Sequence, residues 1–199
     1  MKIAIFASGR GTNFSAILKA SQKNFFKAKI GLLICDNPEA LVLKKAKLGK
    51  IKSVLINRQN YLSREEFEQE IIKHLQNESI NLIVLAGFMR MLSPGFVRKY
   101  KNRIMNIHPS LLPSFKGAHG IKDAFDYGVK ITGVTVHFVD EKVDHGPIIL
   151  QEALEIKDNE SLASLEKKIH QIEHRLYPQA IKLFTSNKLK ISKRRVKAL

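Results

Sequence analysis

The sequence predicts an α/β protein with a single domain built on a mixed, mostly parallel sheet that has helices on both faces. Short apolar runs alternate with helical patterns through the N-terminal half, which is typical of parallel strands joined by helices. Two long strand-like runs then follow one another with only a loop between them, so they are expected to pair antiparallel. The length of 199 residues, 44% of them hydrophobic, suits one domain with a sizeable core.

The N-terminal part contains most of the alternation. Strands are expected over residues 2–7, 28–35, 53–56, 82–86 and 103–107. Helices are expected over residues 13–21, 38–48 and 94–99, and after Ser63. Ser63 and Glu66 have the spacing of a capping box, which predicts where that remaining helix begins. Phe67, Ile71 and Leu75 then recur on one face of it, so this face is expected to be buried.

The C-terminal part adds two strands, a long helix and a basic tail. The strands are expected over residues 132–139 and 148–156. The helix is amphipathic, with apolar residues at three- and four-residue steps: Leu162, Leu165, Ile169, Ile172 and Leu176. We expect the domain to span residues 1–186 and the tail residues 187–199. The tail has six basic residues and no acidic one, and it is expected to be a loosely ordered end, although residues 189–191 alternate as a short edge strand would.

The composition restricts the classes of function. A formal net charge of +16, from 34 basic and 18 acidic residues, raises the expectation of a polyanionic partner. The basic residues are scattered, however, and the tail has no aromatic residue to stack on bases, which favours a small phosphorylated substrate over nucleic acid. No apolar run is long enough to cross a bilayer, and the single Cys35 excludes an intramolecular disulfide. We therefore expect a cytoplasmic protein without membrane partners, as a monomer or homodimer.

The strongest chemical signal joins Asn106, His108 and Pro109 to Asp144. Asn106 and His108 alternate on a strand, so their side chains point to the same side at its end. Pro109 favours an extended backbone at His108. An amide and an imidazole thus stand side by side, and a carboxylate at Asp144 could keep the imidazole protonated. Such a trio suits a reaction in which charge develops on an oxygen and a proton moves. The structural alternative is that His108 is a hydrogen-bonded histidine at the end of a strand, and that Asp144 only forms a turn.

This region resembles the folate-dependent formyltransferases. The resemblance rests on residues 106–113 (NIHPSLLP), 133–139 (GVTVHFV) and 144–148 (DHGPI), and it extends over nearly the whole chain. Its nearest branch is the one that formylates phosphoribosylglycinamide in purine biosynthesis. The resemblance implies a Rossmann-like domain with 10-formyltetrahydrofolate as co-substrate and no metal. It also implies that Asn106 and protonated His108 stabilise a tetrahedral oxyanion, while Asp144 supports His108 and helps to relay a proton through water.

The acceptor site is also assigned through the resemblance. Gly11, Thr12 and Asn13 follow the first strand and open a helix, where free N–H groups attract an anion. Taken alone, this is an ordinary glycine turn with a helix cap. In the family the turn grips the phosphate of the acceptor. Glu173 contacts the glycinamide end there, and His170 is placed in the same site.

The resemblance assigns a further set of residues to the folate. They are Arg64, Met89, Arg90, Met91, Leu92, Asn106, Asp140, Glu141, Lys142, Val143 and Asp144. Two positions depart from the family pattern. Lys116 follows Phe115 where a proline is common, and His145 stands where a small or acidic residue is usual.

Four other readings remain beside this one. His170 and His174 have the spacing of metal ligands, but Gln171 stands where H-E-x-x-H needs a glutamate, and no third ligand is signalled. Methionyl-tRNA formyltransferases and formyltetrahydrofolate hydrolases resemble the same core but carry an additional domain. A non-catalytic nucleic-acid-binding protein would have no need of Asn106, His108 and Asp144. The sequence therefore favours an enzyme acting on small molecules.

Overall fold

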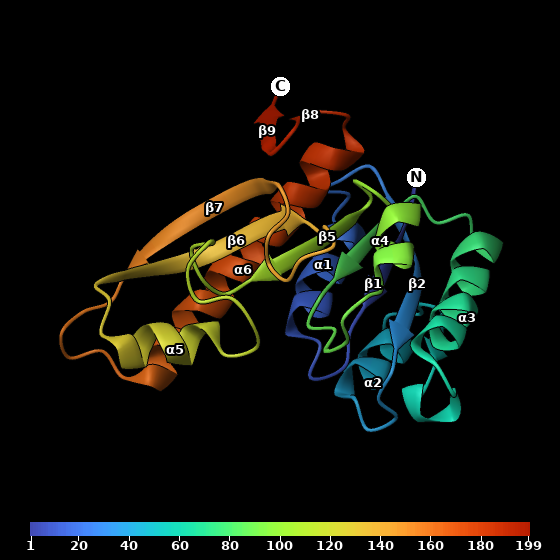
Figure 1. The fold of residues 1–199 in the computed structure, drawn as a ribbon, viewed down its shortest axis with the longest axis horizontal. Coiled ribbons are helices and arrows are strands. Elements are labelled where there is room, and N and C mark those ends of the chain that lie inside the picture. The colour runs from blue at the N-terminus through green and yellow to red at the C-terminus, as the bar shows by residue number, and fades with distance from the viewer.

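The computed structural model describes residues 1–199 and shows one nine-stranded sheet with helices on both faces (Figure 1). The strands are β1 (Lys2–Phe6), β2 (Lys29–Cys35), β3 (Ser53–Leu55), β4 (Leu82–Leu85), β5 (Ile104–His108), β6 (Ile131–Phe138), β7 (Ile148–Glu155), β8 (Leu189–Ser192) and β9 (Arg195–Ala198). The helices are α1 (Thr12–Gln22), α2 (Leu41–Leu48), α3 (Arg64–Asn77), α4 (Pro94–Lys99), α5 (Gly120–Tyr127) and α6 (Leu162–Thr185), with a short 3₁₀ helix, η1 (Arg58–Asn60). None of the helices combines the length and the apolar character needed to cross a membrane.

The sheet is mixed, as predicted. Its strand order is β3-β2-β1-β4-β5-β6-β7-β9-β8. Strands β1 to β5 pair parallel with their neighbours, whereas β6 runs antiparallel to β5, and β7 antiparallel to β6. The direction of connection reverses beside β1, which has β2 on one side and β4 on the other. In open α/β sheets such a reversal leaves a crevice at the carboxyl ends of the strands, and ligands bind there.

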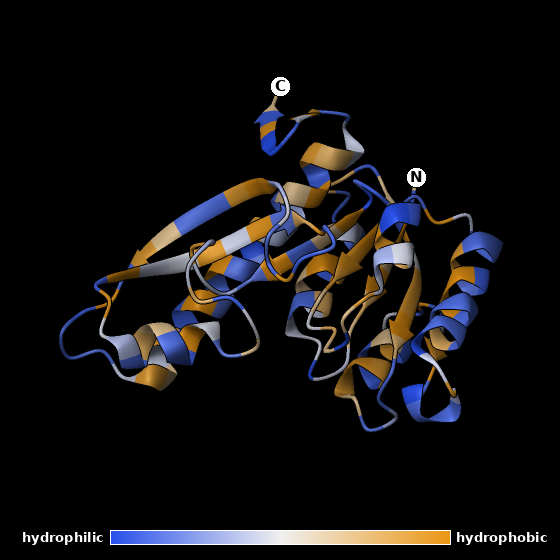
Figure 2. Ribbon diagram, in the orientation of Figure 1, coloured by the Kyte–Doolittle hydropathy of each residue, from blue (hydrophilic) through white to orange (hydrophobic).

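The two faces of the sheet are covered by different helices. Helices α1, α2 and α6 pack on one face, and α3 and α4 pack on the other. Strand β1 shows the alternation directly, because Ile3 and Ile5 belong to the first core whereas Ala4 and Phe6 belong to the second. Strand β4 is accordingly apolar throughout, while α3 shows a hydrophilic outer side (Figure 2). The sheet is thus packed on both faces.

The predicted cap of α3 is present in a modified form. The Ser63 side chain accepts a hydrogen bond from the Glu66 N–H at 3.0 Å. In a capping box the glutamate would accept from Ser63 itself. Here its carboxylate accepts instead from the N–H of Leu62, one residue earlier, at 3.0 Å. Phe67, Ile71 and Leu75 are buried, as the periodicity predicts.

Three features differ from the prediction. Helix α2 begins at Leu41 and not at residue 38, because the Asn37 side chain accepts the Glu39 N–H and holds the preceding residues in a turn. Helix α5 was not predicted. The tail is not a loose end: residues 189–198 form a hairpin in which β9 pairs with β7, so it extends the sheet as the less favoured edge-strand reading described. The hairpin stands at one end of the molecule in Figure 1.

Candidate active site

A cleft of about 640 Å³ opens at the carboxyl ends of β1, β4 and β5, where the sheet reverses its direction of connection. It is lined by almost all the residues that the sequence singled out: Gly11, Thr12, Asn13, Met89, Arg90, Met91, Leu92, Asn106, His108, Asp140, Glu141, Lys142, Val143, Asp144, His170 and Glu173. Arg64 is the exception. It is exposed at the start of α3 and does not line the cleft, so its contact with a folate stays a prediction.

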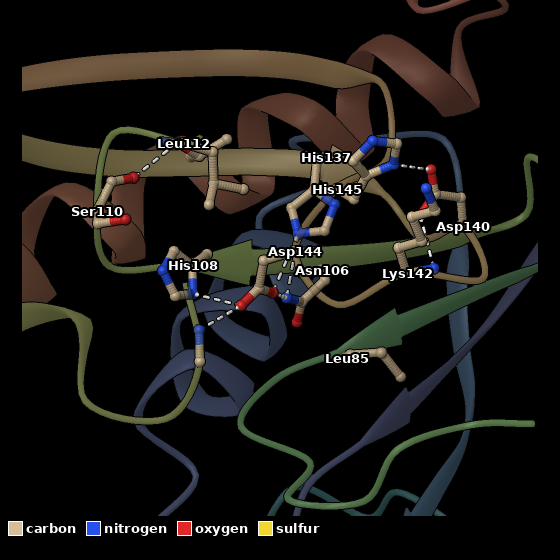
Figure 3. Close-up of polar contacts among 12 residues, drawn as sticks. Leu85, Asn106, His108, Ser110, Leu112, His137, Asp140, Lys142, Asp144 and His145 are labelled. Atoms are coloured by element: carbon tan, nitrogen blue, oxygen red, sulfur yellow. Dashed lines mark hydrogen bonds and ion pairs between the residues drawn. The ribbon is translucent and has the colours of Figure 1, made fainter. Parts of the chain in front are cut away.

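Asn106, His108 and Asp144 meet at the centre of this cleft (Figure 3). The Nδ1 atom of His108 lies 3.4 Å from the Asp144 carboxylate. The amide nitrogen of Asn106 lies 3.4 Å from the other carboxylate oxygen. The strand-end alternation therefore does place the amide and the imidazole on one side, and a single carboxylate joins them.

Asp144 is held in an unusual backbone conformation. Its φ of 44° lies in the left-handed region, which aspartate tolerates better than most residues. The Gly117 N–H donates at 2.8 Å to Oδ2, the carboxylate oxygen that also faces His108. Burial alone would raise the pKa of this carboxyl, but the His137 side chain, the Gly117 N–H and the charge of His108 together hold the pKa below its ordinary value of 3.8. Asp144 is therefore a carboxylate throughout the neutral range.

His137 is a fourth polar residue at the centre, and the sequence analysis did not select it as a site residue. It lies opposite Asn106 across the β5–β6 ladder. Its Nε2 atom is 3.2 Å from the Asn106 amide nitrogen and 3.7 Å from the Asp144 carboxylate. Its Nδ1 atom donates to the Phe138 carbonyl at 2.8 Å. The available sequence signal was a histidine between Val136 and Phe138 in a predicted strand; in the structure its side chain is 2% exposed.

The loop after β5 fixes the His108 ring. The Nε2 atom donates to the Phe115 carbonyl at 2.7 Å, so both ring nitrogens of His108 have partners. A Cβ atom at Gly120 would lie 3.1 Å from that Nε2 atom, which shows how closely the start of α5 covers the ring. Thr135 anchors the same loop, because its hydroxyl donates to the Ser110 carbonyl at 2.7 Å. His108 is thus only 3% exposed and cannot turn away from Asp144.

A second polar cluster lies at the end of the cleft formed by α1 and α6. The Asn13 amide donates to the Glu173 carboxylate at 3.1 Å, and His170 Nδ1 is 2.8 Å from the same oxygen. This hydrogen bond to Glu173 raises the pKa of His170 above its ordinary value of 6.5, against the opposing effect of burial. The Oδ1 atom of the Asn13 side-chain amide is buried and has no hydrogen-bond partner. The cluster therefore combines a cation, a carboxylate and an unused acceptor beside the glycine turn at the start of α1.

The opposite end of the cleft is formed by the segment after β4 and by the loop after β6. Met89 and Met91 are 69% and 65% exposed, which is unusual for such apolar side chains and leaves them available to a ligand. The Met89 N–H donates to the Ser8 hydroxyl at 2.9 Å. Arg90 donates through Nε to the buried Asp36 carboxylate at 2.6 Å. An apolar slot bordered by fixed polar groups suits a flat heterocycle.

The two departures from the family pattern take different places. Lys116 is exposed and does not line the cleft. His145 is half-buried, and its Nδ1 atom lies 2.7 Å from the Asp140 carboxylate (Figure 3). It therefore belongs to the internal structure of the loop after β6.

Comparison with known proteins agrees with this geometry. The formyl transferase family matches residues 1–181. The phosphoribosylglycinamide formyltransferase of Bacillus subtilis (strain 168) is 44% identical over 181 residues, which are 91% of this chain and 93% of that protein. The trifunctional purine biosynthetic protein adenosine-3 of Homo sapiens is 40% identical over 190 residues, which are 96% of this chain and 19% of that protein.

Solved structures resemble the whole fold. The crystal structure of glycinamide ribonucleotide transformylase 1 from Symbiobacterium toebii superposes with a TM-score of 0.97 at 38% identity, over 100% of this chain and 94% of the other. The crystal structure of phosphoribosylglycinamide formyltransferase from Bacillus halodurans superposes with a TM-score of 0.91 at 43% identity, over 94% of this chain and 96% of the other. The chain therefore belongs to the formyl transferase family.

Proposed function

We propose that this protein transfers the formyl group of 10-formyltetrahydrofolate to the amine of 5′-phosphoribosylglycinamide, a step of purine biosynthesis. One observation carries the proposal above the others. A single carboxylate, Asp144, lies 3.4 Å from both the His108 ring and the Asn106 amide, in the cleft that the polar cluster and the apolar slot also line. The polar cluster suits the phosphorylated amine, and the slot suits the folate ring.

The chemistry requires a new C–N bond and the loss of another. The acceptor amine attacks the formyl carbon, and the carbonyl oxygen becomes an oxyanion. The Asn106 amide and the His108 ring donate to this oxygen, and the ring nitrogen that does so exchanges its present partner, the Phe115 carbonyl or Asp144, for the oxyanion. The amine then loses a proton, the folate nitrogen gains one, and the bond from that nitrogen to the formyl carbon breaks. Asp144 is ionised and lies within reach of a bridging water, so it can assist this proton transfer.

The acceptor end is assigned to Gly11, Thr12, Asn13, His170 and Glu173. The glycine turn presents the N-terminus of α1 to the phosphate, and the raised pKa of His170 favours a positive charge beside it. Glu173 is 4% exposed and already accepts two hydrogen bonds, yet it lines the cleft, so it can accept a third from the glycinamide group.

The folate end is assigned to residues 89–92 and 140–144 and to Asn106, with Arg64 as the more distant contact. Both segments line the cleft, and Val143 adds a further exposed apolar side chain. We keep the cytoplasm as the expected location, because Cys35 is a free buried thiol of the kind found in reducing compartments. We keep a monomer or homodimer as the expected state.

A formyl-transfer assay with two acceptors tests the proposal. Purified protein and 10-formyltetrahydrofolate are combined with phosphoribosylglycinamide or with charged initiator tRNA, and the formylated product and free formate are measured. We expect transfer to phosphoribosylglycinamide only. Transfer to the tRNA would favour the methionyl-tRNA reading, and release of formate without any acceptor would favour the hydrolase reading. Binding of RNA without turnover, weakened steeply by salt, would favour a nucleic-acid-binding protein.

A further inference from the structure

The C-terminal hairpin reaches the loop that borders the folate end of the cleft. This loop, residues 139–147, joins β6 to β7, and we call it the cleft loop. Lys193 and Arg194 form the two-residue turn between β8 and β9, and Lys193 has a positive φ of 52°. Residues 189, 191 and 196 of the hairpin pack against the core, so the turn is held in place at the rim of the sheet.

Arg194 contacts the cleft loop from this turn in three ways. Its Nη2 atom donates to the His145 carbonyl at 2.6 Å. Its Nη1 atom lies 3.1 Å from the nitrogens of the His145 ring and 4.0 Å from the Asp140 carboxylate. A planar guanidinium is suited to bridge a carbonyl and a ring in this manner, because its donors point in fixed directions.

Inside the loop, the His145 side chain that contacts Arg194 also contacts Asp140. The His145 Nδ1 atom lies 2.7 Å from one Asp140 oxygen, so this nitrogen donates and Nε2 is left to accept from Arg194. The other Asp140 oxygen accepts the Lys142 N–H at 3.0 Å. The contacts therefore run from the hairpin through His145 and Asp140 to the backbone of the loop, and they tie together both of its ends.

The loop has little else to fix this part of it. Asp144 is anchored at the centre of the cleft by Asn106 and Gly117, but residues 141–143 are exposed and their one other side-chain contact is an exposed ion pair between Arg98 and Glu141. Such surface pairs contribute little to stability. A Cβ atom at Gly146 would lie 1.8 Å from the Phe138 carbonyl, so the return of the loop also depends on close backbone packing.

We propose that Arg194 is a positioning residue for the folate side of the cleft, acting through His145 and Asp140 to hold residues 140–144 in the conformation that lines it. The inference rests on the proposed function for its folate and on the contacts above for its geometry. It gives the basic tail a role that its charge alone did not indicate. It also explains the histidine at 145, which is uncommon in the family at that position and here connects a carboxylate to a guanidinium.

Arg194→Ala tests this, with Arg195→Ala as the matched control. Arg195 is the next residue and is exposed, and its side chain makes no hydrogen bond or ion pair. In Arg194→Ala we expect the KM for 10-formyltetrahydrofolate to rise about three- to tenfold, the scale of one ordinary hydrogen bond, while the KM for the acceptor changes less than twofold. Arg194→Lys should give an intermediate value, because an ammonium can replace one contact but not the fork.

Amide hydrogen exchange supplies a second readout that needs no substrate. Residues 140–146 should exchange faster in Arg194→Ala than in wild type or Arg195→Ala, while residues 189–198 keep their protection. A wild-type protein that fails to formylate any acceptor counts against the proposed function, and leaves this exchange experiment decisive for the loop.

A second variant, His145→Ala, tests the proposal even if Arg194→Ala unfolds the hairpin. This variant leaves the hairpin intact, and it should raise exchange in the loop and the folate KM in the same direction. Because the two side chains act in one chain of contacts, the effects in the double variant should be less than additive. The proposal is overturned if Arg194→Ala matches Arg195→Ala in both readouts, if both KM values rise equally, or if the hairpin melts and His145→Ala has no effect.

Discussion

His108 is the residue on which the chemistry depends most directly. Both of its ring nitrogens are engaged, with Nε2 on the Phe115 carbonyl and Nδ1 facing Asp144. These two contacts fix the orientation of the ring in the cleft before any substrate arrives.

Replacing this ring should affect rate and stability to different extents. His108→Ala should lower kcat by roughly 10²–10³, the usual effect of losing one donor to an oxyanion. It should also lower the melting temperature, because the side chain is 3% exposed and its loss leaves the Phe115 carbonyl without a partner. Steady-state kinetics and thermal denaturation measure the two effects. The exposed His119 offers a control, and wild-type turnover in His108→Ala would refute the assignment.

The cluster proposed to bind the acceptor should have a pH-dependent stability through His170. The hydrogen bond with Glu173 raises the pKa of His170 above 6.5 in the folded state. A raised folded pKa means that the ion pair contributes its full stability below pH 6.5 and loses it as the pH rises through the folded value. The melting temperature of His170→Asn should therefore lie furthest below that of wild type at pH 5.5–6, in about the range where His is charged, and approach it at alkaline pH. If the difference in melting temperature between wild type and His170→Asn is the same at every pH, the pair of His170 and Glu173 is not ionic.

Among the individual residues, the sequence predicted the site well where chain neighbours share a strand end. Asn106 and His108 could be paired by strand alternation alone, and the structure confirms that they face one carboxylate. His137 could not be found in that way, because its place beside Asn106 depends on the register of β5 against β6. Register is a long-range property that no local pattern states.

At the scale of elements, α6 ties the helical layer to the strands that bear the site. Tyr177 is fully buried, and its hydroxyl lies 2.8 Å from the Leu85 carbonyl and 3.0 Å from the Met105 carbonyl. Those carbonyls belong to β4 and β5, next to the cleft. The hydroxyl thus bridges two neighbouring strands from the helix that also supplies Glu173.

Tyr177→Phe should measure this link without opening a cavity. It removes one hydroxyl and keeps the ring, so the free energy of unfolding should fall by about 1–3 kcal/mol, the cost of a buried acceptor left unpaired. Tyr127→Phe makes the same chemical change at a side chain that is 79% exposed, and it should have almost no effect. Denaturant unfolding compares the two. Equal stability of both variants would mean that the strand carbonyls find other partners.

Elements with a strong periodic pattern were predicted, and those without one were not. Strands β1 to β7 and helices α1, α3, α4 and α6 follow from apolar runs, caps and helical stripes. Helix α5 was missed because it has only eight residues, so its apolar stripe of Ile121, Ala124 and Phe125 covers barely two turns. The hairpin was predicted as a loose end because lysine and arginine dominate it, whereas its order comes from partial burial of Leu189, Ile191 and Val196 against the core.

For the molecule as a whole, the net charge of +16 should influence encounter with anionic substrates. We expect kcat/KM for phosphoribosylglycinamide to fall severalfold as sodium chloride rises from about 0.02 to about 0.3 M, because screening shortens the reach of the surface charges. The kcat should stay nearly constant, since the buried centre is screened much less. Initial rates at saturating and subsaturating acceptor separate the two quantities. A salt effect on kcat alone would place the influence of charge in the chemical step.

The hydrogen bond between Asn13 and Glu173 joins residues that are 160 positions apart in the sequence. During synthesis the N-terminal strands can pair and bury their apolar faces early, because their contacts are local. The acceptor site cannot exist at that stage, since α6 must emerge from the ribosome and dock before Glu173 meets the glycine turn. A nascent or truncated chain that stops before α6 can therefore resemble the finished protein over most of its sheet and still recognise no acceptor.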